Sequence, residues 1–387
     1  MKIVPKNLLQ KLTVRFKNIL MAFCIFTLFI GTFEFLLRTT HLFNARISWA
    51  KTDPLFAWVN TPGATYWQLK ENDHPITGKI NKYGFRDNEW SLAKPPGTYR
   101  IAVLGDSYVE ALQVESENSF LSLTAQVLNN NRKIKVELMN FGQSGFTQTD
   151  ELITLKNKVI QFSPDMVILL FVPGNDIDDI SKETASSSFR SFYNFDSNGQ
   201  LILDTSFNKT RSYKIRSLLS PLKQHSALVS LILERYNAYV SSRAQKVTAP
   251  QNSIDGYLSL ATKSPAPAFL RSYNLCKLLI KTMADICLEK KIKFMLVTID
   301  NGSTYLPNVE GQYKAMDATF NVNFFEDDLS EYAKSLDIEY IGLQRVFRES
   351  YQNNSVLLHW GHWNYEGHKL VAEALSDKLN NIIHLNQ

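Results

Sequence analysis

Residues 100–114 read RIAVLGDSYVEALQV, an apolar run that ends in a glycine, an aspartate and a serine. The run from Arg100 to Leu104 is typical of a strand buried on both faces, and the residues after Ser107 favour the start of a helix. The same alternation recurs along the chain. Further strand-like runs lie at residues 136–139, 166–172, 294–299 and 338–341, and helical stretches lie at residues 120–129, 150–160, 268–289, 325–335 and 367–379.

This alternation predicts an α/β fold. Strands separated by helices form a mainly parallel sheet, here of about five strands, and right-handed crossovers place helices on both faces in three layers, α/β/α. An open sheet of this kind binds its ligands at the carboxyl ends of the strands. We therefore expect functional residues directly after each strand.

Composition divides the rest of the chain. The stretch at about 178–265 interrupts the alternation, is rich in serine, asparagine and aromatic residues, and contains one helical stretch at 227–240. This insertion is either a solvated excursion or a cap over a substrate cleft. The predicted division is a basic leader at 1–18, a membrane anchor at 19–37, a loosely structured lead-in segment at 38–97, and a domain at 98–387 that carries the insertion.

The apolar segment at 19–37 predicts a single transmembrane helix. It contains one charge, Glu34, and as a helix it would span about 28 Å, close to the thickness of a bilayer core. The alternatives are a cleaved signal peptide, whose apolar run is shorter and ends at a small-x-small site, and a buried core helix, which is seldom apolar on every face. Five basic and no acidic residues precede the segment. The positive-inside rule then places the N-terminus in the cytoplasm and the domain outside it, in the periplasm if the source is a Gram-negative bacterium.

Charge and cysteine usage exclude other classes. Lysine and arginine number 42 against 37 aspartates and glutamates, and the whole excess of +5 lies in the leader. Nucleic acid is therefore not an expected partner, because its binding needs clustered basic residues. Cys276 and Cys287 would lie about 16 Å apart on one helix, too far for a disulfide. Cys24 lies inside the apolar segment.

Three strand ends carry residues suited to acyl transfer. Ser107 lies at a strand-to-helix turn, where its hydroxyl is exposed and the helix N-terminus offers N–H groups to a developing oxyanion. After the second strand, Gly142 permits a tight turn and brings a backbone N–H to the surface. After the third, Asn175 places a side-chain amide over the same cleft. Each feature alone is also ordinary cap or turn chemistry.

Three histidines cluster near the C-terminus, in the stretch HWGHWNYEGH at 359–368. Histidine is the usual general base for a serine, and His362 follows the last strand, so it returns to the same edge of the sheet. His359 and His362 could instead share a zinc ion, although no acidic or cysteine ligand stands beside them at a familiar spacing. His368 lies at the entry to a helix, where it caps or packs.

These blocks, in this order, resemble the SGNH hydrolases, also called the GDSL esterase superfamily, over roughly residues 98–380. Gly105-Asp106-Ser107 resembles the first block, Gly142 the second, Gly174-Asn175-Asp176 the third and His362 the fifth. The stretches GDSYVEALQV and HWNYEGHKLVAEAL are similar to membrane-anchored bacterial SGNH proteins found with polysaccharide biosynthesis, and distantly similar to the alginate acetyltransferase type.

The resemblance implies a flavodoxin-like SGNH fold and a metal-free, cofactor-free site. It implies Ser107 as the nucleophile and His362 as the general base. The implied oxyanion hole consists of the Ser107 N–H, the Gly142 N–H and the Asn175 side chain.

One expected residue is missing. The family usually carries an aspartate two or three positions before the histidine, where this chain has Trp360 and His359. That acid fixes the histidine tautomer, and its loss from a serine triad can lower the rate by ~10⁴. Three accounts remain: a backbone carbonyl holds His362, an acid from elsewhere such as Asp300 does so, or the site is catalytically weak.

The expected function is a serine esterase outside the cytoplasm that cleaves O-acyl esters, in particular O-acetyl esters on a glycan. One alternative is an O-acetyltransferase of a cell-surface or exported polysaccharide. Another is a non-catalytic, membrane-tethered glycan-binding or assembly protein on the same scaffold. The expected partners are an acylated small molecule or glycan, the membrane, and polysaccharide-assembly proteins.

Overall fold

The computed structural model describes residues 6–40, 42–69, 71–130, 134–244 and 254–384. The chain forms two compact units, one of residues 1–51 with 215–249 and one of residues 52–214 with 250–387. The first five residues of the expected basic leader lie outside the described residues.

A five-stranded parallel sheet forms the centre of the larger unit, as the sequence predicted. In spatial order its strands are β6 (Lys135–Gly142), β5 (Thr98–Gly105), β7 (Met166–Phe171), β10 (Lys293–Thr298) and β11 (Glu339–Gly342). Counted along the chain, the first strand of this sheet, β5, thus lies between the second, β6, and the third, β7. This is the flavodoxin-like order. The switch point of this order lies between β5 and β7, where sheets of this kind bind their ligands.

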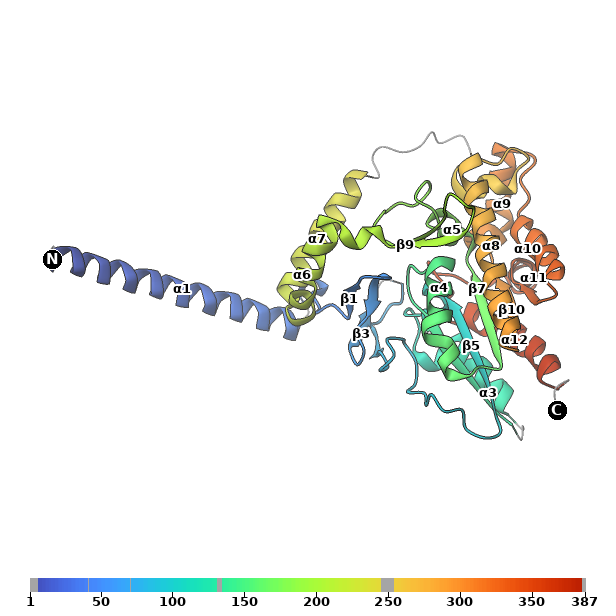
Figure 1. The fold of residues 1–387 in the computed structure, drawn as a ribbon, viewed down its shortest axis with the longest axis horizontal. Coiled ribbons are helices and arrows are strands. Elements are labelled where there is room, and N and C mark those ends of the chain that lie inside the picture. The colour runs from blue at the N-terminus through green and yellow to red at the C-terminus, as the bar shows by residue number, and fades with distance from the viewer. Residues whose placement is uncertain (1–5, 41, 70, 131–133, 245–253, 385–387) are drawn as a thin grey trace. The chain divides into compact units, whose positions relative to one another are not determined.

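Helices cover both faces of the sheet and complete the three predicted layers (Figure 1). One face is covered by α4 (Gln148–Thr154), α8 (Pro267–Glu289) and α10 (Phe324–Ser335), and the other by α3 (Phe120–Asn129), α11 (Gln344–Asn354) and α12 (Tyr365–His384). Alternate residues of β5 enter the two cores: Leu104 packs with the first group and Val103 with the second, and both are fully buried. The apolar run that the sequence shows is therefore a strand buried on both faces.

Shorter elements connect these layers. They are α2 (Ser107–Glu110) after β5, α5 (Pro173–Asp178) after β7, and α9 (Pro307–Met316) between β10 and α10.

The lead-in segment is more regular than the sequence predicted. It contains β1 (Ala50–Asp53), β2 (Ala57–Asn60), β3 (Thr65–Gln68) and β4 (Ile76–Lys79), and β3 pairs with β4 in an antiparallel hairpin. Four-residue strands between turn signals leave too little alternation to recognise in a sequence. Arg86, which follows the hairpin, is buried and donates to the carbonyls of Glu110, Ala111 and Val114. The lead-in is thus bound to the chain just after α2.

The insertion at 178–265 is divided between the two units. Its first part contains the antiparallel pair β8 (Phe192–Phe195) and β9 (Leu201–Asp204), in the larger unit. It continues with α6 (Arg211–His225) and α7 (Ala227–Ala244), which belong from Ile215 onward to the smaller unit.

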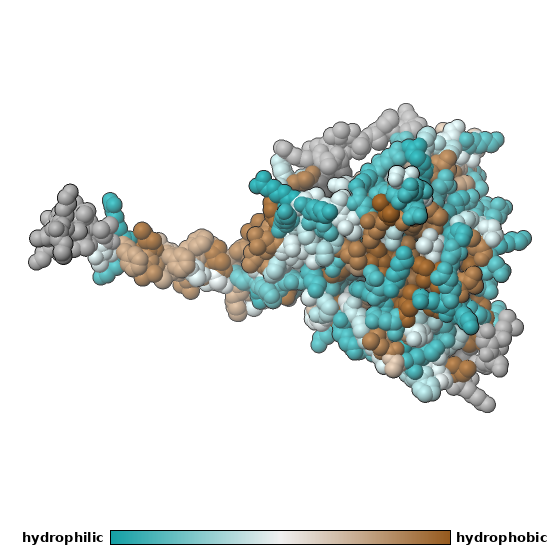
Figure 2. Space-filling view, viewed as in Figure 1, coloured by the Kyte–Doolittle hydropathy of each residue, from teal (hydrophilic) through white to brown (hydrophobic). Residues whose placement is uncertain are grey.

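The smaller unit begins with α1 (Lys6–Thr40), which contains the predicted anchor. Its stretch Thr13–Thr40 is long and apolar enough to cross a membrane, with a mean hydropathy of 2.2. Large apolar side chains along it are exposed, among them Leu28 at 72%. Figure 2 shows apolar residues over most of the visible surface of this helix.

Candidate active site

Ser107 lies where the sequence placed it, at the turn from β5 into α2. The preceding Asp106 caps the helix, since its side chain accepts the N–H of Tyr108 at 2.9 Å. Gly105 is required by close packing, because a Cβ there would lie 2.4 Å from a methyl carbon of Val109. The turn directs the serine toward His362, whose Nε2 lies 2.8 Å from Ser107 Oγ.

His362 lies in the loop between α11 and α12. An isolated bridge between His359 and Trp363 closes this loop, and the N–H of Trp360 donates to the His362 carbonyl at 2.8 Å. The Tyr108 ring packs on the imidazole, with ring centroids 4.8 Å apart. The His362 side chain remains 30% exposed. The imidazole is therefore held in orientation by these contacts while part of it remains open to solvent.

A carboxylate that lies far from the histidine motif in the sequence contacts His362. It belongs to Glu71, in the loop of the β3–β4 hairpin. Its Oε1 lies 2.7 Å from His362 Nδ1, and its Oε2 accepts the backbone N–H of His362 at 2.7 Å and of Gly361 at 3.2 Å. This geometry fits the tautomer in which Nδ1–H donates to Glu71 and Nε2 accepts from Ser107. Of the three accounts of what orients His362, this contact agrees with an acid from another part of the chain. The acid is Glu71, and not Asp300 as the sequence suggested.

The electrostatics of Glu71 keep it charged. Burial raises the pKa of this carboxyl, but the hydrogen bonds from the imidazole and from the two N–H groups outweigh burial and lower the pKa to about 2. The carboxylate is only 16% exposed. It is therefore an ionised, mostly buried group in contact with the imidazole at neutral pH.

Polar contacts hold the loop of Glu71 in place within the larger unit. Asn72 Nδ2 lies 2.9 Å from the Tyr365 hydroxyl, and that hydroxyl donates to Glu115 at 2.7 Å. His74 Nε2 contacts the same Glu115 at 2.9 Å, and its partners raise the pKa of His74. No motif spacing marks these residues, and the one sequence signal is a polar cluster, ENDH at 71–74, between two short apolar runs.

Asp300, the acid that the sequence considered, holds a different histidine. Its Oδ2 lies 2.7 Å from His359 Nε2, and its Oδ1 accepts the Trp363 indole N–H at 2.8 Å. Asp300 is fully buried and His359 is 9% exposed. The two histidines of the zinc alternative therefore contact separate carboxylates. Among the described residues no group of three or more His, Cys, Asp and Glu side chains is placed to hold a metal ion.

His368 packs at the start of α12, as expected. It is fully buried, and its Nδ1 accepts the N–H of Phe120 at 3.3 Å. Burial lowers the pKa of His368 to about 3, so this imidazole is neutral.

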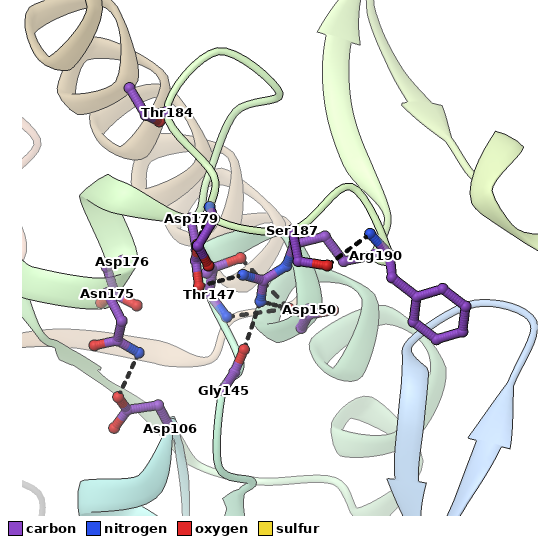
Figure 3. A network of polar contacts seen from close by, with 12 residues as sticks. Asp106, Gly145, Thr147, Asp150, Asn175, Asp176, Asp179, Thr184, Ser187 and Arg190 are labelled. Carbon is purple, nitrogen blue, oxygen red and sulfur yellow. Dashed lines mark hydrogen bonds and ion pairs between the residues drawn. The ribbon is translucent and has the colours of Figure 1, made fainter. Parts of the chain in front are cut away.

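Asn175 follows β7, on the other side of the switch point from Ser107. It belongs to α5, after β7, and its Nδ2 donates to Asp106 Oδ2 at 2.8 Å (Figure 3). An amide carries two N–H donors, so one remains for a second acceptor. Burial raises the pKa of Asp106, while the N–H of Tyr108 and the Asn175 amide oppose that rise.

Gly142 ends β6 next to α2 and is buried. A Cβ at this position would lie 2.5 Å from Val109 Cβ and 2.8 Å from the Glu110 nitrogen, so the close approach of α2 requires glycine. Its N–H donates to Asn140 Oδ1 at 2.8 Å. A substrate oxygen would have to compete with Asn140 for this donor.

Arg190, from the insertion, joins the loops that follow β6 and β7 (Figure 3). Its guanidinium donates to the Gly145 carbonyl at 2.5 Å and contacts Asp179 at 2.8 Å and Asp150 at 3.5 Å. No pattern in the sequence marks Arg190 as a functional residue. Its contacts join the segments that directly follow Gly142 and Asn175.

No protein-family model matches the chain, and no curated protein matches it. Among solved structures, the acetyl xylan esterase AlAXEase covers 72% of this chain over 98% of its own length, with 13% identity and a TM-score of 0.38. An alpha/beta hydrolase, LAE5, from the metagenome of Lake Arreo covers 72% of this chain over 93% of its own, with 15% identity and a TM-score of 0.40. A GDSL-like lipase from Bacteroides thetaiotaomicron matches 73% of this chain and 88% of its own chain, with 12% identity and a TM-score of 0.33.

Proposed function

We propose that this chain is a serine ester hydrolase whose triad is Ser107, His362 and Glu71. The observation that carries the proposal is the unbroken chain of contacts from Glu71 through both imidazole nitrogens to the serine hydroxyl, 2.7 Å and 2.8 Å. A serine is a weak nucleophile until a neighbouring base takes its proton, and an oriented imidazole next to a carboxylate does this.

The proposed reaction proceeds in two steps. Ser107 Oγ attacks the ester carbonyl while His362 Nε2 takes the hydroxyl proton, and the ester C–O bond then breaks as His362 returns that proton to the leaving alcohol. Water, deprotonated by His362, attacks the acyl-serine and releases the carboxylic acid with free Ser107. Glu71 remains ionised throughout and stabilises the imidazolium.

The proposed oxyanion donors are the Ser107 N–H and the free N–H of the Asn175 amide. Ser107 is the first residue of α2, and N–H groups in a first helical turn have no acceptor within the helix. The Gly142 N–H is the third proposed donor and would exchange Asn140 for the oxyanion. Donors aimed at a developing charge each contribute roughly 10²–10³ in rate.

The proposed substrate is an O-acyl ester, in particular an acetyl ester on a glycan. Two solved structures similar in fold are named as acetyl xylan esterases. The proposed location is outside the cytoplasm, with α1 crossing the membrane and the basic leader on the cytoplasmic side. An acetyltransferase would use the same acyl-serine and differ only in the acceptor, a sugar hydroxyl in place of water.

The test is labelling of the full-length protein, in detergent, with a fluorophosphonate that reacts only with activated serines. We expect one adduct, on Ser107, that disappears in Ser107→Ala and His362→Ala. Ser119→Ala is the matched control, because Ser119 also lies at the start of a helix, as the N-cap of α3, and its side chain bonds Ser116 and Ser122 instead of a histidine. Unlabelled protein from the same preparation would then be tested for acetate release from acetylated xylo-oligosaccharides, with and without unacetylated oligosaccharide as acceptor.

Absence of an adduct on folded protein would overturn the proposal in favour of a non-catalytic glycan-binding scaffold. That alternative drew its support from the missing aspartate, and Glu71 now stands in the corresponding contact.

A further inference from the structure

In the smaller unit, α6 from Ile215 onward and α7 each carry a stripe of exposed apolar side chains. We propose that these helices lie in the membrane interface beside α1, with their apolar faces against lipid, so that the protein is held by a three-helix anchor. The inference rests on the proposed crossing of the membrane by α1. It concerns only residues 1–51 and 215–249, which form one compact unit.

The depth of α7 follows from Glu34. This carboxylate, the one charge in the predicted anchor, accepts the N–H of Ala227 at 2.8 Å, the N–H of Leu228 at 2.9 Å and the Ser226 hydroxyl at 2.9 Å. It thereby caps the first turn of α7, where a negative charge is favoured. Arg38, one turn further along α1, bonds Glu34 at 2.6 Å and also donates to the His225 carbonyl.

These contacts fix where α7 begins relative to the bilayer. Glu34 lies six residues before Thr40, the end of the apolar stretch, which is about 9 Å along a helix axis. The start of α7 therefore lies at the depth where the apolar stretch meets the polar boundary. A carboxylate is tolerated there because its acceptor sites are filled by N–H, hydroxyl and guanidinium donors.

Apolar packing supports the same junction. Leu37, Ala45 and Ala227 are fully buried against one another, with Phe33 and Leu228 at their edge. This small cluster joins α1 and α7 at the end of the span.

Beyond the junction both helices expose apolar stripes. On α6, Ile215, Leu218 and Leu222 are 47%, 76% and 52% exposed. On α7, Ile232, Tyr236 and Val240 are 57%, 62% and 48% exposed. Spacings of three and four residues put each set on one helix face.

A lipid surface fits these stripes better than water. Contiguous exposed apolar faces mark contact with a partner or a membrane, and the apolar helix that these two adjoin is itself the proposed membrane span. Tyrosine such as Tyr236 is enriched at bilayer interfaces. The neighbouring charges are mostly basic: Arg216, Lys223 and Arg235 against Glu234. Basic amphipathic helices lie in the interface, where anionic headgroups attract them.

The experiment uses full-length protein in lipid nanodiscs, with a nitroxide spin label at one introduced cysteine. The background is Cys24→Ala, since Cys276 and Cys287 are buried. Labels at Ile232→Cys, Tyr236→Cys and Val240→Cys report α7. Leu28→Cys on α1, 72% exposed, is the lipid control, and Leu288→Cys at the end of α8, 76% exposed, is the water control. Collision rates with oxygen, which concentrates in lipid, and with a water-soluble nickel chelate are compared.

We expect the α7 labels to behave like Leu28→Cys, with severalfold more oxygen collisions and severalfold fewer chelate collisions than Leu288→Cys. Chelate collisions on α7 equal to those at Leu288→Cys, with Leu28→Cys still in lipid, would overturn the proposal and leave the α1 anchor standing. Low collision rates with both reagents on α7 would also overturn it, in favour of a covering protein. A label at Leu28 that reports water would overturn the anchor and this inference together.

Discussion

Two histidine–carboxylate pairs lie three residues apart in this protein and have different surroundings. His362 and Glu71 are 30% and 16% exposed, and His362 reaches the hydroxyl of Ser107. His359 and Asp300 are 9% and 0% exposed, and the other oxygen of Asp300 holds the Trp363 indole N–H. The bond lengths are the same, 2.7 Å in both pairs.

The contrast shows that a histidine–carboxylate contact alone does not identify a triad. The His362 pair joins a serine hydroxyl at a strand end to a partly open surface, as general-base catalysis requires. The His359 pair lies among aromatic rings, with His359 stacked on Tyr305 at a centroid distance of 5.6 Å. We interpret the first as chemical and the second as structural, and the following predictions test that division.

The largest expected difference is between the two histidines. His362→Gln should lower the rate of fluorophosphonate labelling by ~10³-fold or more, because it removes the base. His359→Gln should lower it less than ~10-fold in protein that remains folded. Comparable losses in both variants, at equal folded fraction, would contradict the division.

The second largest difference is expected between the two carboxylates, in their effect on kcat. Glu71→Gln keeps the size of the side chain but removes its charge, and we expect kcat for an acetyl ester to fall by ~10²–10⁴. Asp300→Asn, the matched change in the other pair, should alter kcat less than ~10-fold. A Glu71→Gln enzyme with unchanged kcat would mean that the backbone of the loop, and not the carboxylate, orients His362.

For the free energy of unfolding we expect the reverse order, with a larger loss from a change at Asp300 than from a change at Glu71. Asp300→Ala leaves the buried His359 and the Trp363 N–H without their partner, which costs about 1–3 kcal/mol of unfolding free energy. Glu71→Gln should cost less, since its amide oxygen can still accept the N–H groups of Gly361 and His362. Thermal melting of the full-length variants in one detergent measures this difference. A larger loss in Glu71→Gln would mean that the Glu71 loop supports the fold.

The smallest effect concerns pH. Because the pKa of Glu71 in the folded protein, about 2, lies below its ordinary value of 4.5, its charge stabilises the fold fully above pH 4.5, and that contribution is lost as pH falls toward 2. The difference in Tm between the native chain and Glu71→Gln should therefore stay constant from neutral pH to about pH 5 and shrink below that. A difference that instead grew on acidification would show that Glu71 is protonated in the folded state.

Much of the larger unit could be predicted from the sequence, because local pattern determines it. The strand-like run 294–299 is the buried strand β10 at Lys293–Thr298, and the helical stretch 120–129 is α3. Ser107 directly follows β5, and the loop of His362, between α11 and α12, was expected to return to the same edge of the sheet. The two side chains do meet, 2.8 Å apart. Their catalytic roles, with those of Gly142 and Asn175, stay predictions.

Glu71 could not be predicted in the same way. It follows no strand of the central sheet, and its position depends on contacts made far along the chain, such as those of Asn72 with Tyr365 and of Arg86 with the carbonyls after α2. Nothing in a window of 10 or 20 residues encodes such contacts. The position of α7 depends in the same way on Glu34, a residue that the sequence shows only as a lone charge.

The separation of the three side chains along the chain has a consequence for synthesis. His362 is 255 residues from Ser107 and 291 from Glu71, so a growing polypeptide holds the acid and the nucleophile long before the base has been made. In the proposed triad, a chain that ends before His362 lacks the base and would not cleave esters. The first appearance of esterase activity during synthesis would then mark the completion of the chain through His362.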